Sequence, residues 1–294
     1  MKGIVLAAGA GTRLYPASQP ISKILLPIYD KPMIYYPLST LMLAGIKDIM
    51  IITNESDYDN FRKVLGNGSQ FGLNISYEIQ YVQRGIADAF IIAEDFIAGD
   101  SSALILGDNI FHGHGFSTIM KNAIANNNGA TVFGYTVKDP ERFGVVEFDE
   151  NKKVLSLEEK PKNPKSNYAV TGLYFYDENV SEYAKQLEPS QRGELEITDL
   201  NKLYLEKGLL NVEILGRGFS WLDTGTHDSM LQASNFVQSM ELNKGVKISC
   251  LEEIAYNMGF ISAGDLLDKI EKYGNNSYYS YIRNIVMQDL THIR

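Results

Sequence analysis

The stretch that decides the fold is GIVLA at residues 3–7, which runs directly into Ala8-Gly9-Ala10-Gly11-Thr12-Arg13-Leu14. Its first part has the length and composition of a buried β-strand. Similar short apolar runs follow at residues 48–53, 74–80 and 103–106, and helical periodicity occupies residues 32–44, 58–65 and 86–96. This alternation predicts an α/β fold with a mostly parallel sheet flanked by helices. The ligand site of such a sheet lies beyond the carboxyl ends of its strands.

The pattern changes in the second half of the chain. A helix at residues 116–126 and a strand at 130–137 continue the alternation, but 144–148, 154–159 and 169–176 read as short strands separated by turns. A helix at 196–207, a strand at 209–215 and a helix at 226–241 complete the main body, and helical segments follow at 251–258, 263–272 and 278–289. We expect one α/β domain over residues 1–243, with a small β-rich subregion at about 139–225, and a helical appendage over 244–294.

The charge balance excludes broad nucleic-acid binding. The 294 residues include 27 Lys and Arg against 36 Asp and Glu, which gives a net charge of −9. A protein that holds DNA or an anionic membrane through its general field normally carries the opposite sign. No apolar run reaches the length of about 18 residues that a membrane span needs, and the single cysteine, Cys250, cannot form an intrachain disulfide. We expect a cytoplasmic protein without nucleic-acid or membrane partners.

The glycine loop fits neither of two common nucleotide motifs. Leu14 stands where the dinucleotide fingerprint G-x-G-x-x-G needs its third glycine, and Thr12-Arg13 stands where a Walker A loop needs Lys-Ser/Thr. A plain flexible turn is one remaining interpretation. The other is a polyphosphate cradle, in which backbone N–H groups act together with Arg13 and with Lys23 ten residues later.

Several motifs together resemble the sugar-1-phosphate nucleotidylyltransferase family. They are L-A-x-G-x-G-T-R-L-x-P from Leu6, S-K-x-L-L-P from Ser22, and the segments YDKPMIYYPLSTLMLAGI (29–46), YAVTGLYFYD (168–177), RGELEITDLN (192–201) and GRGFSWLDTGTHDS (216–229). The resemblance extends from Lys2 to about Tyr256. It implies a Rossmann-like nucleotide-diphospho-sugar transferase fold, with a nucleotide half at about residues 1–115 and the β-rich subregion binding the sugar.

The resemblance also implies an activity. A dTMP group would pass from dTTP to α-D-glucose 1-phosphate, giving dTDP-glucose and pyrophosphate with Mg²⁺ as cofactor. This reaction is the first step toward dTDP-rhamnose and other deoxysugars of cell-surface polysaccharide such as lipopolysaccharide O-antigen. The nucleophile is a phosphate monoester that is already largely dianionic at neutral pH, because its second pKa is about 6. The site therefore needs positioning and charge neutralisation, and it needs no general base.

The family's functional residues map onto positions of this chain. The resemblance assigns catalysis to Arg13, Lys23, Lys160 and Arg192. It assigns nucleotide binding to Leu6, Gly9, Gly11, Thr12, Arg13, Lys23, Gln80, Gly85 and Asp108. It assigns sugar binding to Asn109, Gly144, Glu159, Lys160, Val170, Tyr174 and Arg192, and it assigns Mg²⁺ binding to Asp108 and Asp223. Simpler interpretations stand beside three of these: Asp108 as a turn residue, Asp223 as the cap of the helix near Thr226, and Glu159-Lys160 as a solvated pair.

Departures from the family pattern leave the nucleotide open. Ala8 replaces a usual glycine, Asp88 replaces a usual glutamine, and Arg84 adds a cation in a loop without its usual prolines. UTP is therefore an alternative nucleotide, and another hexose 1-phosphate is a further alternative substrate. A catalytically silent regulatory subunit is a second alternative, although Arg13, Lys23 and both aspartates are present. A dinucleotide oxidoreductase is disfavoured by Leu14.

The family also implies a homotetramer with a regulatory nucleotide-sugar site, in which the appendage would make subunit contacts. Matching positions are Gly113, Arg217, Glu253 and Ile254. His112 replaces a usual tyrosine and Asn257 a usual arginine. Loss of a cation weakens a diphosphate pocket, so we expect weaker feedback inhibition by a dTDP-deoxysugar than is typical of the family.

Overall fold

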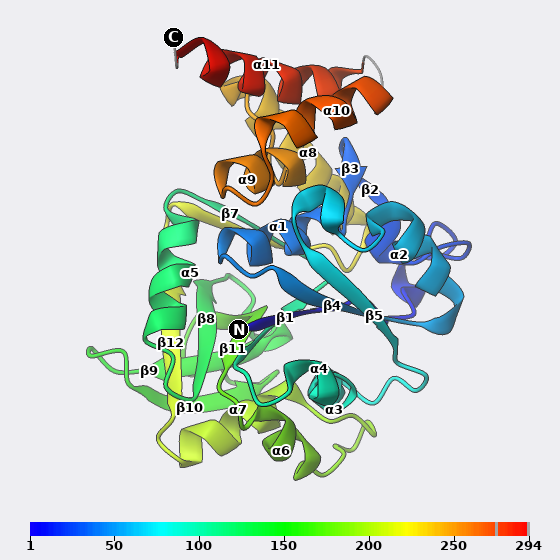
Figure 1. Ribbon diagram of the computed structural model, residues 1–294. Helices are drawn as coiled ribbons and strands as arrows, with labels where there is room; N and C mark the ends of the chain where they lie inside the picture. Colours follow the sequence, from blue (N-terminus) through cyan, green and yellow to red (C-terminus); the bar gives the residue numbers. More distant parts are fainter. Residues whose placement is uncertain (274–275, 293–294) are drawn as a thin grey trace.

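A mixed sheet runs through the centre of the molecule, as the computed structural model in Figure 1 shows. The structure describes residues 1–273 and 276–292, without the side chains of residues 273 and 289–292. Four parallel strands lie in the order β5-β4-β1-β6, namely Asn74–Ile79, Asp48–Thr53, Lys2–Leu6 and Ser102–Leu106. The remaining strands of this sheet are β8 (Ala130–Thr136), β9 (Gly144–Phe148), β10 (Val154–Glu159), β11 (Tyr168–Tyr176) and β12 (Leu210–Leu215). The predicted α/β fold with a mostly parallel sheet is confirmed.

Strand β11 connects the parallel part of the sheet to its β-rich part. Its second half pairs with β6 from Leu173 to Tyr176, whereas its first half pairs with β9 at Ala169. Its other edge pairs with β8, and the register shifts between Val170 and Tyr174. The predicted β-rich subregion therefore extends the same sheet.

Both faces of the sheet are buried, because consecutive residues of the central strands enter different cores. Ile4 and Met50 belong to one cluster, while Val5 and Ile51 belong to the other, as the two-residue period of a strand requires. One face is covered by α1 (Tyr35–Leu43), α2 (Tyr58–Leu65), α5 (Phe116–Ala125) and α9 (Leu251–Asn257). The other is covered by α3 (Asp88–Ile92), α4 (Glu94–Ile97), α6 (Val180–Lys185) and α7 (Ile197–Glu206).

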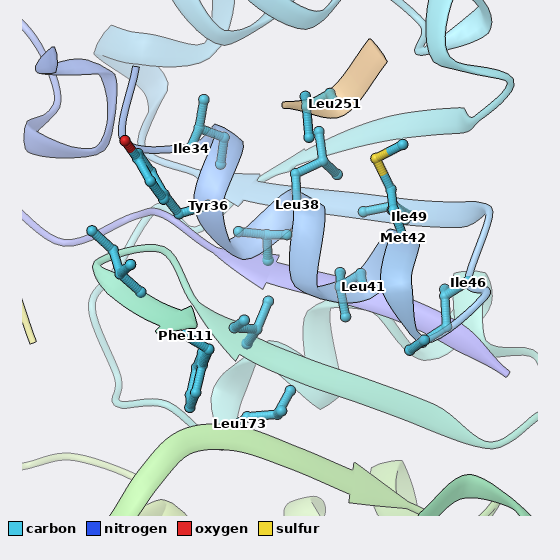
Figure 2. Close-up of a cluster of buried hydrophobic side chains, with 14 of the residues drawn as sticks. Ile34, Tyr36, Leu38, Leu41, Met42, Ile46, Ile49, Phe111, Leu173 and Leu251 are labelled. Carbon is cyan, nitrogen blue, oxygen red and sulfur yellow. The ribbon is translucent and has the colours of Figure 1, made fainter. Parts of the chain in front are cut away.

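Helix α1 is the central element of the first core. Figure 2 shows Leu38, Leu41 and Met42 projecting from it among side chains of the strands and of α9. Residues 36–42 are all buried. Complete burial of one Leu or Ile side chain contributes about 1.5–3 kcal/mol, so this helix anchors the strands β1, β6 and β7 (Asn109–Gly113) against which it packs.

The helices predicted at residues 86–96 and 32–44 differ from the observed ones. The single helix expected at 86–96 is wrong: α3 and α4 are separated at Ala93 (φ −89°, ψ 9°). The Ser181 hydroxyl donates to the carbonyl of Phe90 (3.0 Å), which a continuous helix would use for Glu94. The helix expected at 32–44 begins at Tyr35, because Lys31 and Pro32 form the short hairpin β2–β3 (Pro27–Ile28 and Lys31–Pro32).

Two strands that the sequence pattern did not indicate form a separate antiparallel pair. These are β7 (Asn109–Gly113) and β13 (Phe219–Asp223). Polar Asn109 and His112 and the shortness of both segments hide the strand signal. Short 3₁₀ helices occupy Thr12–Leu14 (η1), Lys23–Leu25 (η2), Glu55–Asp57 (η3), Ser69–Phe71 (η4) and Pro140–Arg142 (η5).

The chain ends in helices that lie together at the top of Figure 1. Helix α8 (His227–Lys244) leads to α9, α10 (Ala263–Tyr273) and α11 (Ser277–His292). The last three helices and the residue before α9 share a small core of Cys250, Leu266, Ile270, Ile282 and Val286. The buried amine of Lys31 contacts Glu241 at 3.0 Å and so ties the β2–β3 hairpin to α8. The appendage predicted over 244–294 includes residues 274–275 and 293–294, which lie outside the described residues. Throughout the described ranges, every helix is too short or too polar to cross a bilayer.

Candidate active site

A cavity of about 560 Å³ lies between the glycine loop and the β-rich part of the sheet. Leu106, at the carboxyl end of β6, contributes to its wall, in agreement with the predicted location. Its lining includes many residues that the sequence assigned: Arg13, Lys23, Asp108, Asn109, Gly144, Glu159, Lys160, Val170, Tyr174, Arg192 and Asp223. The structure thus brings together side chains from residue 13 to residue 223.

The four predicted cations all line this cavity but differ in their partners. Lys23 forms an ion pair with Asp108, and Lys160 lies 3.4 Å from Glu159. The guanidinium of Arg192 donates to both carboxylate oxygens of Glu196, each at 2.9 Å. Arg13 is exposed and has no ion pair or hydrogen bond from its side chain within the described residues. It is therefore available to an anionic ligand.

Asp108 and Asp223 are brought close by the β7–β13 pair. Asp108 sits in the turn between β6 and β7, and Asp223 pairs in register with Asn109. The carbonyl of Asp108 accepts hydrogen bonds from the hydroxyl (2.8 Å) and N–H (3.1 Å) of Thr224. Burial and the negative charge of Asp108 raise the pKa of Asp223, against the opposing charges of Lys23 and Arg142. Two carboxylates that repel each other in a half-buried place are a fitting site for a cation.

Asp223 does not cap the following helix. The cap of α8 is Thr226, whose hydroxyl accepts the N–H of Ser229 at 3.1 Å, and Ser229 in turn accepts the N–H of Thr226. This reciprocal arrangement satisfies the first turn of the helix. The carboxylate of Asp223 therefore remains available to the cavity, which removes the capping interpretation.

Asn109 holds the aspartate side of the cavity in place. Its Oδ1 accepts from the N–H of Gly172 (3.0 Å) and from Nε1 of Trp221 (2.6 Å), while its Nδ2 donates to Asp108 (3.0 Å). A Cβ at Gly172 would lie 2.6 Å from Asn109 Oδ1, so only glycine fits there. Asn109 lines the cavity as predicted, but its amide is used mainly to join β7, β11 and β13.

The opposite wall contains the groups assigned to the sugar. The Thr198 hydroxyl on α7 donates to Glu159 Oε2 at 2.6 Å. Gly144 leaves room for this pair, since a Cβ there would lie 3.4 Å from the same oxygen. Burial and the nearby charge of Glu159 raise the pKa of Tyr174, so its phenol stays protonated. This wall is consequently held by hydrogen bonds between its own residues.

The glycine loop forms a smaller cavity of about 290 Å³ that shares Arg13, Lys23 and Gly225 with the first. Gly11 and Thr12 line it, and Gly9 lines an adjoining one. The loop from Gln80 is tethered to it, because Nε2 of Gln83 donates to the carbonyl of Ala8 at 2.9 Å. Ala8 is buried and does not adopt a positive φ, which agrees with the expectation that its methyl group is tolerated.

Gln80 and Gly85, which the resemblance assigns to the nucleotide and more closely to its base, lie outside the lining of these cavities, as does Leu6 at the end of β1. Gln80 is buried, and its Nε2 donates to Asp88 (2.9 Å) and to the carbonyl of Gly85 (3.4 Å). Asp88 also accepts from Arg84 at 2.8 Å. Two of the departures from the family pattern, Arg84 and Asp88, thus form one ion pair that orients Gln80.

The four positions assigned to regulation lie away from the main cavity. Gly113 pairs with Phe219 at the start of β13, and Arg217 lies in the exposed turn before it. Glu253 on α9 accepts from the hydroxyl of Tyr281 (2.8 Å), and burial raises the pKa of its carboxyl. Ile254 packs against the core around α1. Their regulatory role stays a prediction.

Sequence reasoning missed several residues of the cavity. Arg142, Phe143, Thr198, Asn201 and Trp221 line it but were not assigned. An exposed arginine or a helical asparagine has no local pattern that marks it as functional. Thr198 and Asn201 stood inside a motif, RGELEITDLN, but their spacing of three on one helix face became meaningful only with the cavity in view.

The comparisons with known proteins agree with this site. The family model described as nucleotidyl transferase matches residues 2–240. Glucose-1-phosphate thymidylyltransferase from Neisseria meningitidis is 57% identical over 97% of this chain and 99% of its own length. The enzyme of the same name from Xanthomonas campestris is 53% identical over 99% of both chains.

Solved structures show the same architecture. A proposed glucose-1-phosphate thymidylyltransferase from Bacillus anthracis, crystallised with sucrose, has 45% identity and a TM-score of 0.74, covering 80% of this chain and 94% of its own. UDP-glucose pyrophosphorylase bound to UDP-glucose, with 24% identity and a TM-score of 0.73 over 81% of this chain and 98% of its own, shows the shared fold alone. The chain therefore belongs to the nucleotidyl transferase family.

Proposed function

We propose that this enzyme transfers a dTMP group from dTTP to α-D-glucose 1-phosphate and releases pyrophosphate. The observation that carries the proposal is one cavity lined by Arg13, Lys23, Lys160 and Arg192 together with two aspartates. The relatives that share nearly the full length of this chain bear the corresponding name. The presence of every one of these charged side chains disfavours a catalytically silent subunit.

The chemistry joins two anions. An oxygen of the sugar phosphate attacks the α-phosphorus of the nucleotide, one P–O bond forms, and the bond to the bridging oxygen of pyrophosphate breaks. The attacking phosphate needs no deprotonation at neutral pH, because its second pKa is about 6. The main barrier is electrostatic repulsion, which preorganised positive charge lowers.

The cations divide this work by position. Arg13, beside the glycine loop, stabilises the charge that develops on the departing pyrophosphate. Lys23 shares both cavities with Arg13 and contacts the nucleotide phosphates. Lys160 and Arg192, on the far wall, hold the sugar phosphate and exchange their contacts with Glu159 and Glu196 for contacts with it.

Mg²⁺ is the proposed cofactor, held by Asp108 and Asp223. Carboxylate oxygens suit this ion, and a cation would relieve the repulsion that raises the pKa of Asp223. Within the described residues, no group of three or more His, Cys, Asp and Glu could hold a metal alone. Substrate oxygens and water would complete the shell, which is usual for Mg²⁺. When bound, the ion supplies positive charge to the α-phosphate.

The family resemblance assigns the contact with the base to Gln80, and an acceptor at this position would suit a thymine or uracil nucleotide. Both N–H groups of Gln80 are directed to Asp88 and Gly85, so Oε1 is the amide atom left to accept from a base, although Gln80 itself is buried and outside the lining of the cavities described above. Thymine and uracil carry an N–H at the matching edge, whereas cytosine carries an acceptor there. UTP remains the second candidate, because this contact does not distinguish the two bases.

Assembly, regulation and pathway complete the proposal. A homotetramer with a regulatory site near Gly113, Arg217, Glu253 and Ile254, and a place in deoxysugar synthesis for cell-surface polysaccharide, follow from the family resemblance. Burial, together with the positive charge of Lys244, lowers the pKa of His112. This histidine is therefore neutral at physiological pH and adds no cation to the proposed regulatory site. The cytoplasm is the proposed location, in keeping with a single buried cysteine.

The test is a pyrophosphate-release assay with purified protein, MgCl₂ and glucose 1-phosphate, run with dTTP, UTP, ATP, CTP and GTP in turn. We expect release with dTTP, a lower or equal rate with UTP, and loss of release when EDTA removes the metal. Release with none of the five nucleotides would overturn the proposal. Galactose 1-phosphate and mannose 1-phosphate serve as controls for the hexose.

A further inference from the structure

Helix α7 places a buried amide against the sugar side of the cavity. Thr198 and Asn201 lie three residues apart on one face of the helix and both line the cavity. Asn201 is only 1% exposed. A polar side chain this deeply buried normally has all its hydrogen-bonding groups satisfied.

Among the described residues, only the oxygen of this amide has a hydrogen-bond partner. Oδ1 of Asn201 accepts the hydroxyl of Tyr176 at 2.6 Å. Tyr176 is completely buried between the rings of Phe90 and Tyr204, so its hydroxyl cannot turn to water. No residue in the described part of the chain accepts a hydrogen bond from Nδ2 of Asn201. Because Tyr176 fixes Oδ1, the two N–H donors remain for a ligand in the cavity.

The neighbouring groups complement this donor. Glu159 is an acceptor whose position Thr198 fixes from the same face of α7. A sugar hydroxyl is the group that both donates to a carboxylate and accepts from an amide N–H. The hydroxyl of Tyr174, which lines the same wall, also has no hydrogen-bond partner within the described residues.

We propose that Asn201 is a specificity-determining residue, which donates from Nδ2 to one hydroxyl of the hexose. Tyr176 is its positioning residue, because it holds the amide with the donors toward the cavity. This inference rests on the proposed function and adds a residue to the sugar side of that site. An analogue lacking the contacted hydroxyl would leave the buried donor unsatisfied and be disfavoured.

The test compares glucose 1-phosphate with its 2-, 3-, 4- and 6-deoxy analogues in the pyrophosphate-release assay. We expect the wild-type enzyme to lose about 10-fold or more in kcat/KM with the analogue that lacks the contacted hydroxyl. In the double variant Tyr176→Phe/Asn201→Leu, which removes both partners of the buried hydrogen bond, this analogue and glucose 1-phosphate should react equally well. The penalties for the other analogues should not change.

Three further variants separate recognition from folding. Asn201→Asp keeps an acceptor for Tyr176 and removes both donors, so it should lose the same discrimination while the buried hydrogen bond survives. Tyr176→Phe alone keeps the donors and should retain part of the discrimination. Tyr204→Phe removes a comparable buried hydroxyl that bonds to Asp177 (2.7 Å) instead, and its penalties should equal those of the wild type.

The outcomes distinguish the two proposals. A wild-type enzyme that releases pyrophosphate while both Asn201 variants keep every analogue penalty would overturn the inference alone. A wild-type enzyme without any activity on glucose 1-phosphate would overturn the proposed function and the inference with it. The inference is supported if only the Asn201 variants lose the kcat/KM penalty for one deoxy analogue while circular dichroism shows that they are folded.

Discussion

The two sides of the cavity hold their polar groups in different ways. On the glycine-loop side, Arg13 is exposed and unpaired within the described residues, and Lys23 has a single partner, Asp108. On the sugar side, Glu159 is fixed by Thr198, and Arg192 is held by Glu196. Under the proposed function, the first side offers the exposed charge of Arg13 to a flexible triphosphate, whereas the side chains that the second side offers to the sugar phosphate are already paired with neighbours.

The difference has a kinetic consequence. Substitutions on the glycine-loop side should lower kcat, because they remove charge that acts mainly when pyrophosphate departs. Substitutions on the sugar side should change KM or the choice of sugar, because they alter groups that touch the ground-state substrate. Five experiments can break or sharpen this contrast.

The largest effect is expected from Arg13→Ala. Removal of one preorganised charge from a transition state typically lowers the rate about 10²–10³-fold, and we expect this in kcat, with little change in either KM. Steady-state kinetics of pyrophosphate release would measure it. Arg62→Ala, which removes an exposed arginine of α2, serves as the matched control. A near-normal kcat in the Arg13 variant would remove this residue from the catalytic group.

Gly172→Ala should displace Asn109 and thereby disturb both β11, which carries Gly172, and the nearby Asp108. The new methyl group would meet Asn109 Oδ1 at 2.6 Å, and Asn109 is bonded to Asp108. Displacement of a reacting arrangement by about 1 Å can lower the rate about 10²-fold. Gly216→Ala is the control, because nothing lies within 4 Å of a Cβ there. Equal kcat values in the two variants would show that the Asn109 arrangement tolerates movement.

Protonation of Asp223 should lower the activity of the enzyme as the pH becomes acidic. Burial and the charge of Asp108 raise the pKa of Asp223, so its carboxylate is lost earlier than that of an ordinary aspartate as the pH falls. Activity that needs this carboxylate to hold a cation should decrease about 10-fold per pH unit below that pKa. The pH profile of kcat/KM at fixed Mg²⁺ measures it. A profile flat down to the usual aspartate range would contradict the assignment.

The same raised pKa makes activity and stability change in opposite directions: as the pH rises, activity should increase while the free energy of unfolding decreases. Between the ordinary pKa of 3.8 and the raised one, the folded protein holds a proton that the unfolded chain has released. The free energy of unfolding therefore decreases as the pH rises through this window, and the penalty persists at neutral pH. Asp223→Asn should raise Tm by about 2–4 °C for each kcal/mol of repulsion relieved, while it loses activity. Calorimetry without added metal would show a lowered Tm if this were wrong.

The smallest effect is expected from Glu196→Gln. The variant removes the charge that competes for Arg192, so KM for glucose 1-phosphate should fall about two- to fivefold, the range of an exposed ion pair. The KM for the nucleotide should stay the same, which is the internal control. Lys202→Gln breaks another exposed pair on α7, with Asp199 at 3.0 Å, and should change neither constant.

Local pattern predicted much of the fold. Strands β4, β9 and β10 and helix α2 begin and end at the expected residues, because their apolar spacing is determined within a few neighbours. The β7–β13 pair was missed, because its strands are short, are interrupted by polar residues and lie about a hundred residues apart. Nothing in the local sequence shows that Asp108 and Asp223 meet. Their pairing came from the resemblance alone.

The candidate site was predictable to the same extent. Motif matching placed all four cations at one cavity, because the motifs carry their order along the chain. It could not show that Asn109 bonds to Trp221, or that Nδ2 of Asn201 has no acceptor among the described residues. Such facts depend on which side chains meet across elements, and residue type does not determine this.

Strand β11 has one more consequence. Its residue Val170 lines the cavity and its Gly172 supports Asn109, while the same backbone runs on beside β6. Successive residues of a strand advance by about 3.3 Å, so the distance between the cavity wall at Val170 and the part of β11 that pairs with β6 is fixed by the backbone of one strand. Because one continuous strand joins the β-rich wall of the cavity to the parallel strands, thermal movement of these two parts relative to each other is limited.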